Sequence, residues 1–195
     1  MEAPFTPELF PHIRIVMGMV IGLAITRLLM GVAGLVQHPN RASLSSIHLL
    51  WVGSILLELI HFWWWQFALF QLTDWHFGIF FFLIVYTIVL FLLATLLFPN
   101  PIYEYDGYED FFMKRRGWFF GLFAATFVFD IIDSLLKGPT NWELFGLHYY
   151  VQVPVGLVLC GVAVWTANRK IHLGIVLLHL AYQLSWITRL FYINA

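Results

Sequence analysis

Six long stretches of mainly apolar residues follow one another along the chain, with short polar segments between them. Each is close to the length of about 20 residues that an α-helix needs to cross the hydrocarbon core of a bilayer. The stretches cover residues 13–36, 47–70, 77–98, 118–136, 147–167 and 173–194. This pattern predicts an all-α integral membrane protein, a six-transmembrane-helix bundle that forms a single polytopic membrane domain over residues 1–195.

The composition supports this class of protein and excludes others. Hydrophobic residues make up 61% of the chain and charged residues only 11%, whereas a soluble domain carries about 25% charged residues. Ten Lys and Arg face eleven Asp and Glu, so no surplus positive charge is present to bind nucleic acid. We expect the partners to be the lipid bilayer, a small solute or ion, and further copies of the chain or a membrane complex.

Basic residues near the predicted helix ends indicate the orientation. The connections after the first, third and fifth helices carry most of them: Arg41, Lys114, Arg115, Arg116, Arg169 and Lys170. Arg14, Lys137 and Arg189 lie at the opposite end. The positive-inside rule therefore places the first group in the cytoplasm and both termini outside the plasma (inner) membrane.

A weak internal similarity relates the first three predicted helices to the last three. His76 and Tyr86 in the first half fall on His172 and Tyr182 in the second, with the same spacing. Two three-helix halves of opposite topology are typical of many transporters. Chance alignment of apolar helices explains the same matches, so an inverted repeat is one of two interpretations.

Four ionisable side chains lie well inside the predicted spans: Arg27, Glu58, Asp130 and Asp133. Such groups are costly in a membrane and mark functional sites. Asp133 can pair with Lys137, four residues further along the same helix. We therefore expect Arg27 to neutralise Glu58 or Asp130, or to share both. The remaining carboxyl group would then be protonated or hold a cation.

Polar side chains share one face of several predicted helices, which is expected of a face turned to the bundle interior. On this basis we assign a transport and proton-relay group consisting of Arg27, Glu58, His61 and Asp130. Glu58 would carry the proton, and His61, one turn away, would relay it. A secondary polar lining consists of Ser54, Asp133, Gln152, His179, Tyr182 and Gln183.

The sequence leaves three functions open. The first is a transporter or channel for an ion or small solute, proton-coupled through Arg27, Glu58 and Asp130. The second is a membrane redox protein that holds a haem b between His61 and His179, or a metal ion with Glu58 and His61. The third is a non-catalytic accessory or receptor subunit, in which the polar faces only join helices.

Motifs of familiar membrane enzymes do not occur in the sequence. It contains no H-E-x-x-H zinc pair, no G-x-S-x-G nucleophile and no glycine-rich phosphate loop. We therefore expect transport or binding rather than catalysis, with no bound cofactor.

Overall fold

The computed structural model describes residues 9–39, 43–72 and 74–193. This part of the chain forms six long α-helices and two short 3-10 turns, and it contains no strand. The helices are α1 (Leu9–Gln37), α2 (Ser46–Trp65), α3 (Phe77–Thr95), α4 (Tyr108–Leu136), α5 (Pro139–Trp165) and α6 (Arg169–Ile193). The turns are η1 (Gln66–Gln71) and η2 (Ile102–Glu104). The all-α class and the six helices are therefore confirmed.

Five of these helices are long and apolar enough to cross a membrane, namely α1, α2 continued by η1, α3, α4 and α6. Within the described side chains of α5, residues Tyr149–Trp165 form a further, shorter apolar segment. Large apolar side chains cover the outside of the bundle, and Leu23 and Met30 of α1 are 61% and 65% exposed. A surface of this kind suits lipid rather than water, so the chain is a multi-pass membrane protein.

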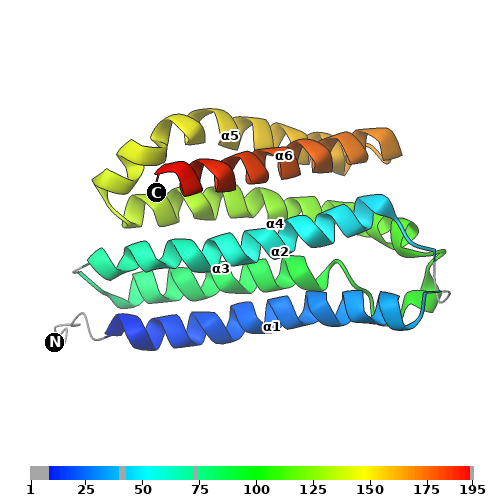
Figure 1. The fold of residues 1–195 in the computed structure, drawn as a ribbon, viewed down its shortest axis with the longest axis horizontal. Coiled ribbons are helices and arrows are strands. Elements are labelled where there is room, and N and C mark those ends of the chain that lie inside the picture. The colour runs from blue at the N-terminus through cyan, green and yellow to red at the C-terminus, as the bar shows by residue number, and fades with distance from the viewer. Residues whose placement is uncertain (1–8, 40–42, 73, 194–195) are drawn as a thin grey trace.

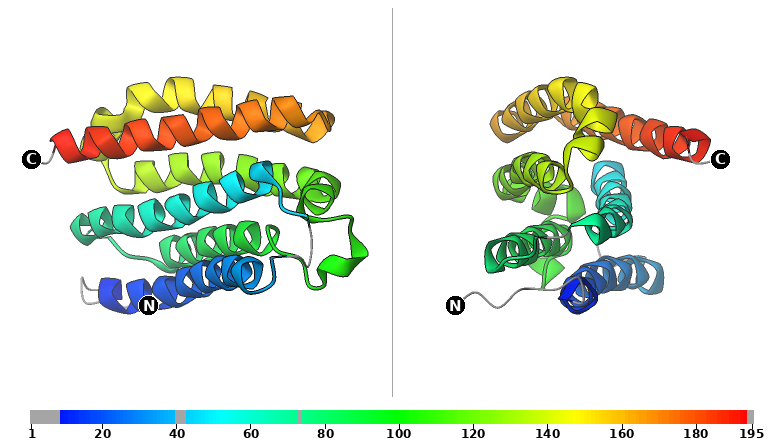
Figure 2. Two further views of the ribbon diagram at one scale, coloured as in Figure 1. Left: turned by 45° about the vertical axis from the view of Figure 1, so that its right-hand side comes forward. Right: turned by 90° about the vertical axis from the view of Figure 1, so that its left-hand side faces the viewer.

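Successive helices run in opposite directions, so that α1 begins and α6 ends at the same end of the bundle (Figure 1). We call this the termini end, and the opposite end, with the connections after α1, α3 and α5, the basic end. Viewed along the helices, α5 and α6 form one outer layer, α2 and α4 the middle, and α1 and α3 the other outer layer (Figure 2). Helix α2 is central and contacts α1, α3, α4 and α6.

Local sequence signals set several helix ends. The side chain of Ser45 caps α2 by accepting a hydrogen bond from a backbone N–H of its first turn. Gly107, which precedes α4, has a φ of +122°, and a Cβ at this position would clash with Ser43. Gly138 (φ +92°) followed by Pro139 forms the turn between α4 and α5. The turn between α4 and α5 is therefore short, and these two helices pack closely side by side.

Helix α4 begins at Tyr108, ten residues before the start predicted from hydropathy. Its first turns are too polar to be recognised as a span, but they are helical all the same. Lys114 pairs with Asp110 one turn earlier, at 2.8 Å, and Arg116 donates to the carbonyl oxygen of Met113 at 2.8 Å. Pairs at this spacing stabilise a helix that has little apolar surface.

The two halves of the chain pack differently. Helix α1 lies closely against α3, whereas its counterpart α4 lies closely against α5. In the described residues, α4 and α6 are not packed in the way that α1 and α3 are. The inverted repeat considered from the sequence therefore has no counterpart in these contacts.

Candidate functional site

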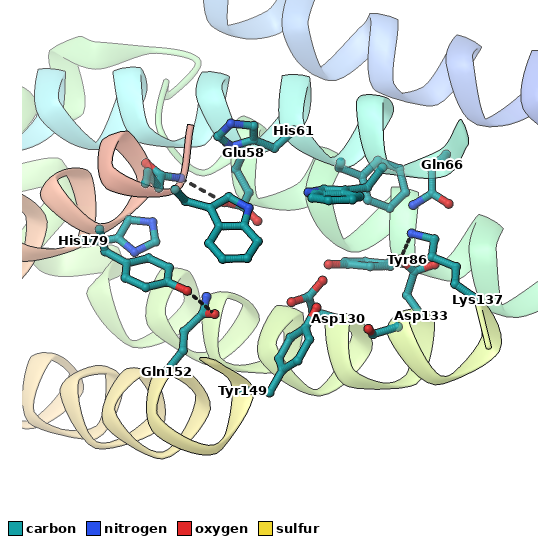
Figure 3. Close-up of a pocket in the computed structure, with 16 residues that line it drawn as sticks. Glu58, His61, Gln66, Tyr86, Asp130, Asp133, Lys137, Tyr149, Gln152 and His179 are labelled. Carbon is teal, nitrogen blue, oxygen red and sulfur yellow. Dashed lines mark hydrogen bonds and ion pairs between the residues drawn. The ribbon is translucent and has the colours of Figure 1, made fainter. Parts of the chain in front are cut away.

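A cavity of about 90 Å³ lies between α2, α4, α5 and α6, and Gln66 of η1 and Tyr86 of α3 complete its wall (Figure 3). Its lining on α2 and α4 comes from the second half of α2 and the last turns of α4, which lie nearer the termini end. The cavity has room for several water molecules or a small ion. Most of the residues predicted from the sequence line it: Glu58, His61, Asp130, Asp133, Gln152, His179, Tyr182 and Gln183. The polar faces of α2 and α6 thus point to the interior, as predicted.

Gln183 joins α6 to the polar face of α2. Its amide nitrogen donates to Glu58 Oε2 at 2.9 Å and to the carbonyl oxygen of Ser54 at 3.3 Å. Its amide oxygen accepts from the hydroxyl of Ser54 at 3.0 Å. Ser54 does not line the cavity, but through Gln183 it fixes the position of Glu58. On the facing helices, the Tyr182 hydroxyl donates to Gln152 Oε1 at 2.6 Å.

Glu58 of α2 and Asp130 of α4 point into the cavity from opposite sides (Figure 3). Tyr149 of α5 lies beside Asp130 in the same view. Within the described part of the chain, neither carboxylate belongs to an ion pair. Two acidic groups therefore share a small polar space with no cation of the protein bound to either.

Asp133 and Lys137 form the ion pair expected from their spacing on α4. The side chains of both residues are almost fully buried at the cavity wall, with 5% and 2% of their area exposed. A buried carboxylate of this kind is stable only with a charged partner. The ion pair of Lys137 is therefore with Asp133 rather than with Glu58 or Asp130.

At the cavity, Nε2 of His179 has no hydrogen-bond partner among the described residues. The side chain of Gln66 is fully buried and interacts with the carboxylate of Asp133. Buried polar groups are normally satisfied by protein or ordered water, so the free nitrogen of His179 leaves room for a water molecule in the cavity.

Among the lining residues that the sequence did not assign to the site are Gln66, Tyr86 and Ser134. Ser134 follows Asp130 by four residues, so an extended polar face on α4 would have included it. Gln66 comes directly after Trp65, at the end of an aromatic run, and Tyr86 is a lone polar group in the very apolar α3. No periodic pattern indicated that these two reach the cavity.

A layer of aromatic rings separates the cavity from the basic end. The Trp51 ring stacks on His179, with centroids 5.6 Å apart, and meets Phe119, Phe120 and Phe123 edge-on at 5.1–5.4 Å. Trp51 is fully buried. Trp51 and the three Phe rings lie between the cavity residues and the basic end along α2 and α4.

The expected pairing of Arg27 with Glu58 or Asp130 is wrong. Nη2 of Arg27 donates to the carbonyl oxygen of Phe98, just beyond α3, at 2.7 Å. Arg27 lines a different pocket, at the basic end. The reason is length: α1 has 29 residues and α3 only 19, so a residue near the middle of α1 lies level with the end of α3.

The cavity does not suit a haem. His61 and His179 both line it, but its volume of about 90 Å³ is well below the ~300–1,000 Å³ of sites that hold drug-sized ligands, and a porphyrin is larger still. Within the described residues, no three His, Cys, Asp or Glu side chains are grouped as a metal site requires.

Comparisons with known proteins do not identify a family. No protein-family model matches the chain, and neither the curated proteins nor the solved structures give a match. The function therefore has to be inferred from the site, and the site is an acidic cavity enclosed by membrane-spanning helices.

Proposed function

We propose that this chain is a transporter or channel for a small cation, coupled to protons through Glu58 and Asp130. The observation that carries the proposal is that both carboxylates face one polar cavity and neither is paired with a basic side chain of the described residues. Two ionised carboxylates without a cation are unfavourable so close together. A proton or an incoming cation would relieve the repulsion.

Lys137 supports a cation as the transported species. Its positively charged ammonium group lies in the cavity wall, where it binds the carboxylate of Asp133. The wall thus already accommodates one ammonium group beside a carboxylate. Aromatic rings of Tyr86 and Tyr149 also line the space, and ring faces attract cations.

The aromatic layer around Trp51 supports a gated pathway. It closes the cavity on the side of the basic end, and transporters expose a central site to one side of the membrane at a time. By the positive-inside rule, we expect the basic end of the bundle to face the cytoplasmic side of the plasma membrane. The cavity would then load from outside, and movement of Trp51 would release the cation inwards.

The test is cation-driven proton flux in liposomes that contain the purified protein and a pH-sensitive dye. We expect Glu58→Gln and Asp130→Asn to reduce the flux to that of protein-free liposomes, because each removes one ionisable group from the cavity. Asp74→Asn, at an exposed carboxylate between η1 and α3, is the matched control and should transport normally.

Glu58→Gln protein that transports like the wild type would rule out Glu58 as proton carrier. Folding is checked by a monodisperse profile in size-exclusion chromatography. Wild-type protein that is folded but carries no flux of any small cation would favour an accessory subunit, in which Gln183 and Glu58 only join α2 to α6.

A further inference from the structure

A second pocket lies at the basic end, far along the bundle from the carboxylates. Its volume is about 660 Å³, and Arg27 of α1, the segment after α3, η2 and the first turns of α4 form its walls. Two guanidinium groups line it, those of Arg27 and Arg115, together with one carboxylate, that of Glu104. The lining therefore carries a net charge of +1.

Packing fixes the position of Arg27 in this pocket. Gly31 lies one turn after Arg27 on α1, and a Cβ at Gly31 would stand 2.3 Å from the ring of Phe98. The missing side chain therefore lets Phe98 pack directly on α1. This contact places the Phe98 carbonyl oxygen 2.7 Å from Nη2 of Arg27. One of the five N–H donors of the guanidinium is thus used to orient the group.

Neither guanidinium is neutralised by a carboxylate of the described residues. Arg115 donates to the hydroxyl of Tyr105 at 3.2 Å, a neutral acceptor. Two neighbouring acidic groups bind other cations, because Asp110 pairs with Lys114 at 2.8 Å and Glu109 with Arg169 at 3.3 Å, whereas Glu104 remains in the lining and is counted in its net charge. The positive charge of the pocket is therefore available to an anion from outside the chain.

The surroundings of the pocket are apolar and face the bilayer. Leu96, Phe98 and Phe111 contribute to its walls, and Trp118, at its edge, is 70% exposed. Close to Arg27 on α1, Met30 is 65% exposed to the lipid side. Trp118 is the first residue of the apolar stretch 118–136, and an exposed Trp at the end of an apolar span is typical of the level of the lipid headgroups.

We propose that this pocket binds a phosphate-bearing anion, and that the anion is the headgroup of an acidic phospholipid. Guanidinium groups bind phosphate oxygens through two parallel hydrogen bonds. A phosphodiester carries one negative charge, which matches the net charge of +1 in the lining. The apolar rim offers acyl chains a surface beside the headgroup. This inference does not depend on the transport function.

The experiment is native mass spectrometry of the detergent-purified protein, titrated with dioleoyl phosphatidylglycerol or with dioleoyl phosphatidylcholine. We expect the wild type to retain the acidic lipid at concentrations at which the zwitterionic lipid is lost. Arg115→Gln should weaken retention of the acidic lipid about tenfold, the effect of losing one charge-assisted contact. Arg27→Gln should have at least the same effect.

Lys114→Gln is the matched control, since it removes the same charge next to Arg115 but from a side chain already paired with Asp110. It should leave retention within about twofold of the wild type, because an exposed pair contributes little. Arg115→Gln loses only a bond to a tyrosine hydroxyl, so it carries the test even if Arg27→Gln fails to fold.

A parallel titration with inorganic phosphate identifies the source of the anion. If millimolar phosphate displaces the acidic lipid, the pocket is still a phosphate site, but its ligand is a soluble anion instead of a lipid. No displacement supports the lipid. Equal retention of both lipids with no effect of phosphate, or equal losses for Arg115→Gln and Lys114→Gln, would overturn the proposal.

Discussion

The two ends of the bundle contain opposite charges in opposite settings. Near the termini end, Glu58, Asp130 and Asp133 surround about 90 Å³ of space closed off by aromatic rings. At the basic end, Arg27 and Arg115 line an open pocket of about 660 Å³. We propose the small cavity as a site for a cation and the large pocket as a site for a phosphate-bearing anion. The separation of charge along the bundle supports both proposals.

Helix α4 connects the two settings. Its first turns carry Arg115 into the basic pocket, and its last turns carry Asp130, Asp133 and Lys137 into the cavity. Because the helix has 29 residues, it spans about 43 Å at 1.5 Å per residue. Both sites therefore include residues of one helix, and a shift of α4 along its axis would move lining residues in both.

Removal of the Lys137 ammonium group from the cavity wall should have the largest effect. Lys137→Met leaves Asp133 buried with no charged partner, which we expect to reduce the free energy of unfolding by about 3–5 kcal/mol. Chemical denaturation in detergent measures the loss. The double variant Lys137→Met/Asp133→Asn should recover most of it, since no charge is then left unpaired. Equal instability of the single and double variants would contradict the ion pair as the cause.

A substitution at the basic end should lower the stability less, because it alters only side-chain packing. Gly31→Ala forces the Phe98 ring away from α1, and we expect a loss of about 1–3 kcal/mol, the usual cost of overpacking. Gly34→Ala, three residues later, has nothing within 4 Å of the new Cβ and should not lower the stability. Thermal unfolding of the two variants compares them, and similar values would show that Phe98 does not depend on Gly31.

The smallest effect is expected between the two ends, at the link from α2 to α6. Ser54→Ala removes the hydroxyl that binds Gln183, and hydrogen bonds between membrane helices contribute about 0.6 kcal/mol on average. Ser185→Ala, at an exposed position of α6, should have no measurable effect on unfolding. A Ser54→Ala loss of several kcal/mol would show that Gln183 organises the whole cavity.

Much of the fold and of the cavity could be predicted from the sequence, because both depend on periodicity within single helices. Ser54, Glu58 and His61 share one face of α2, and that face had to turn inward in a membrane. The pair of Asp133 and Lys137 followed from a spacing of four residues. Gln66, in contrast, reaches the cavity from the end of α2, where no periodic pattern indicated its direction.

Arg27 shows what the sequence could not provide. Hydropathy gives the position of a residue along its own helix but not the offset between neighbouring helices. Arg27 is near the middle of α1, yet it lies level with Phe98, beyond the end of the shorter α3. The partners of a charged side chain therefore depend on which helices surround it, and only the packing of the helices in the structure shows this.

The buried ammonium group of Lys137 has a kinetic consequence. Because it is tethered to α4 beside the cavity, it is a competitor whose local concentration never falls, and tethered groups act at effective concentrations in the millimolar range or above. If the cavity binds a mobile cation, as we propose, that cation would compete with this fixed group for Asp133. Under the transport proposal, this competition would shorten the time for which a cation stays beside Asp133.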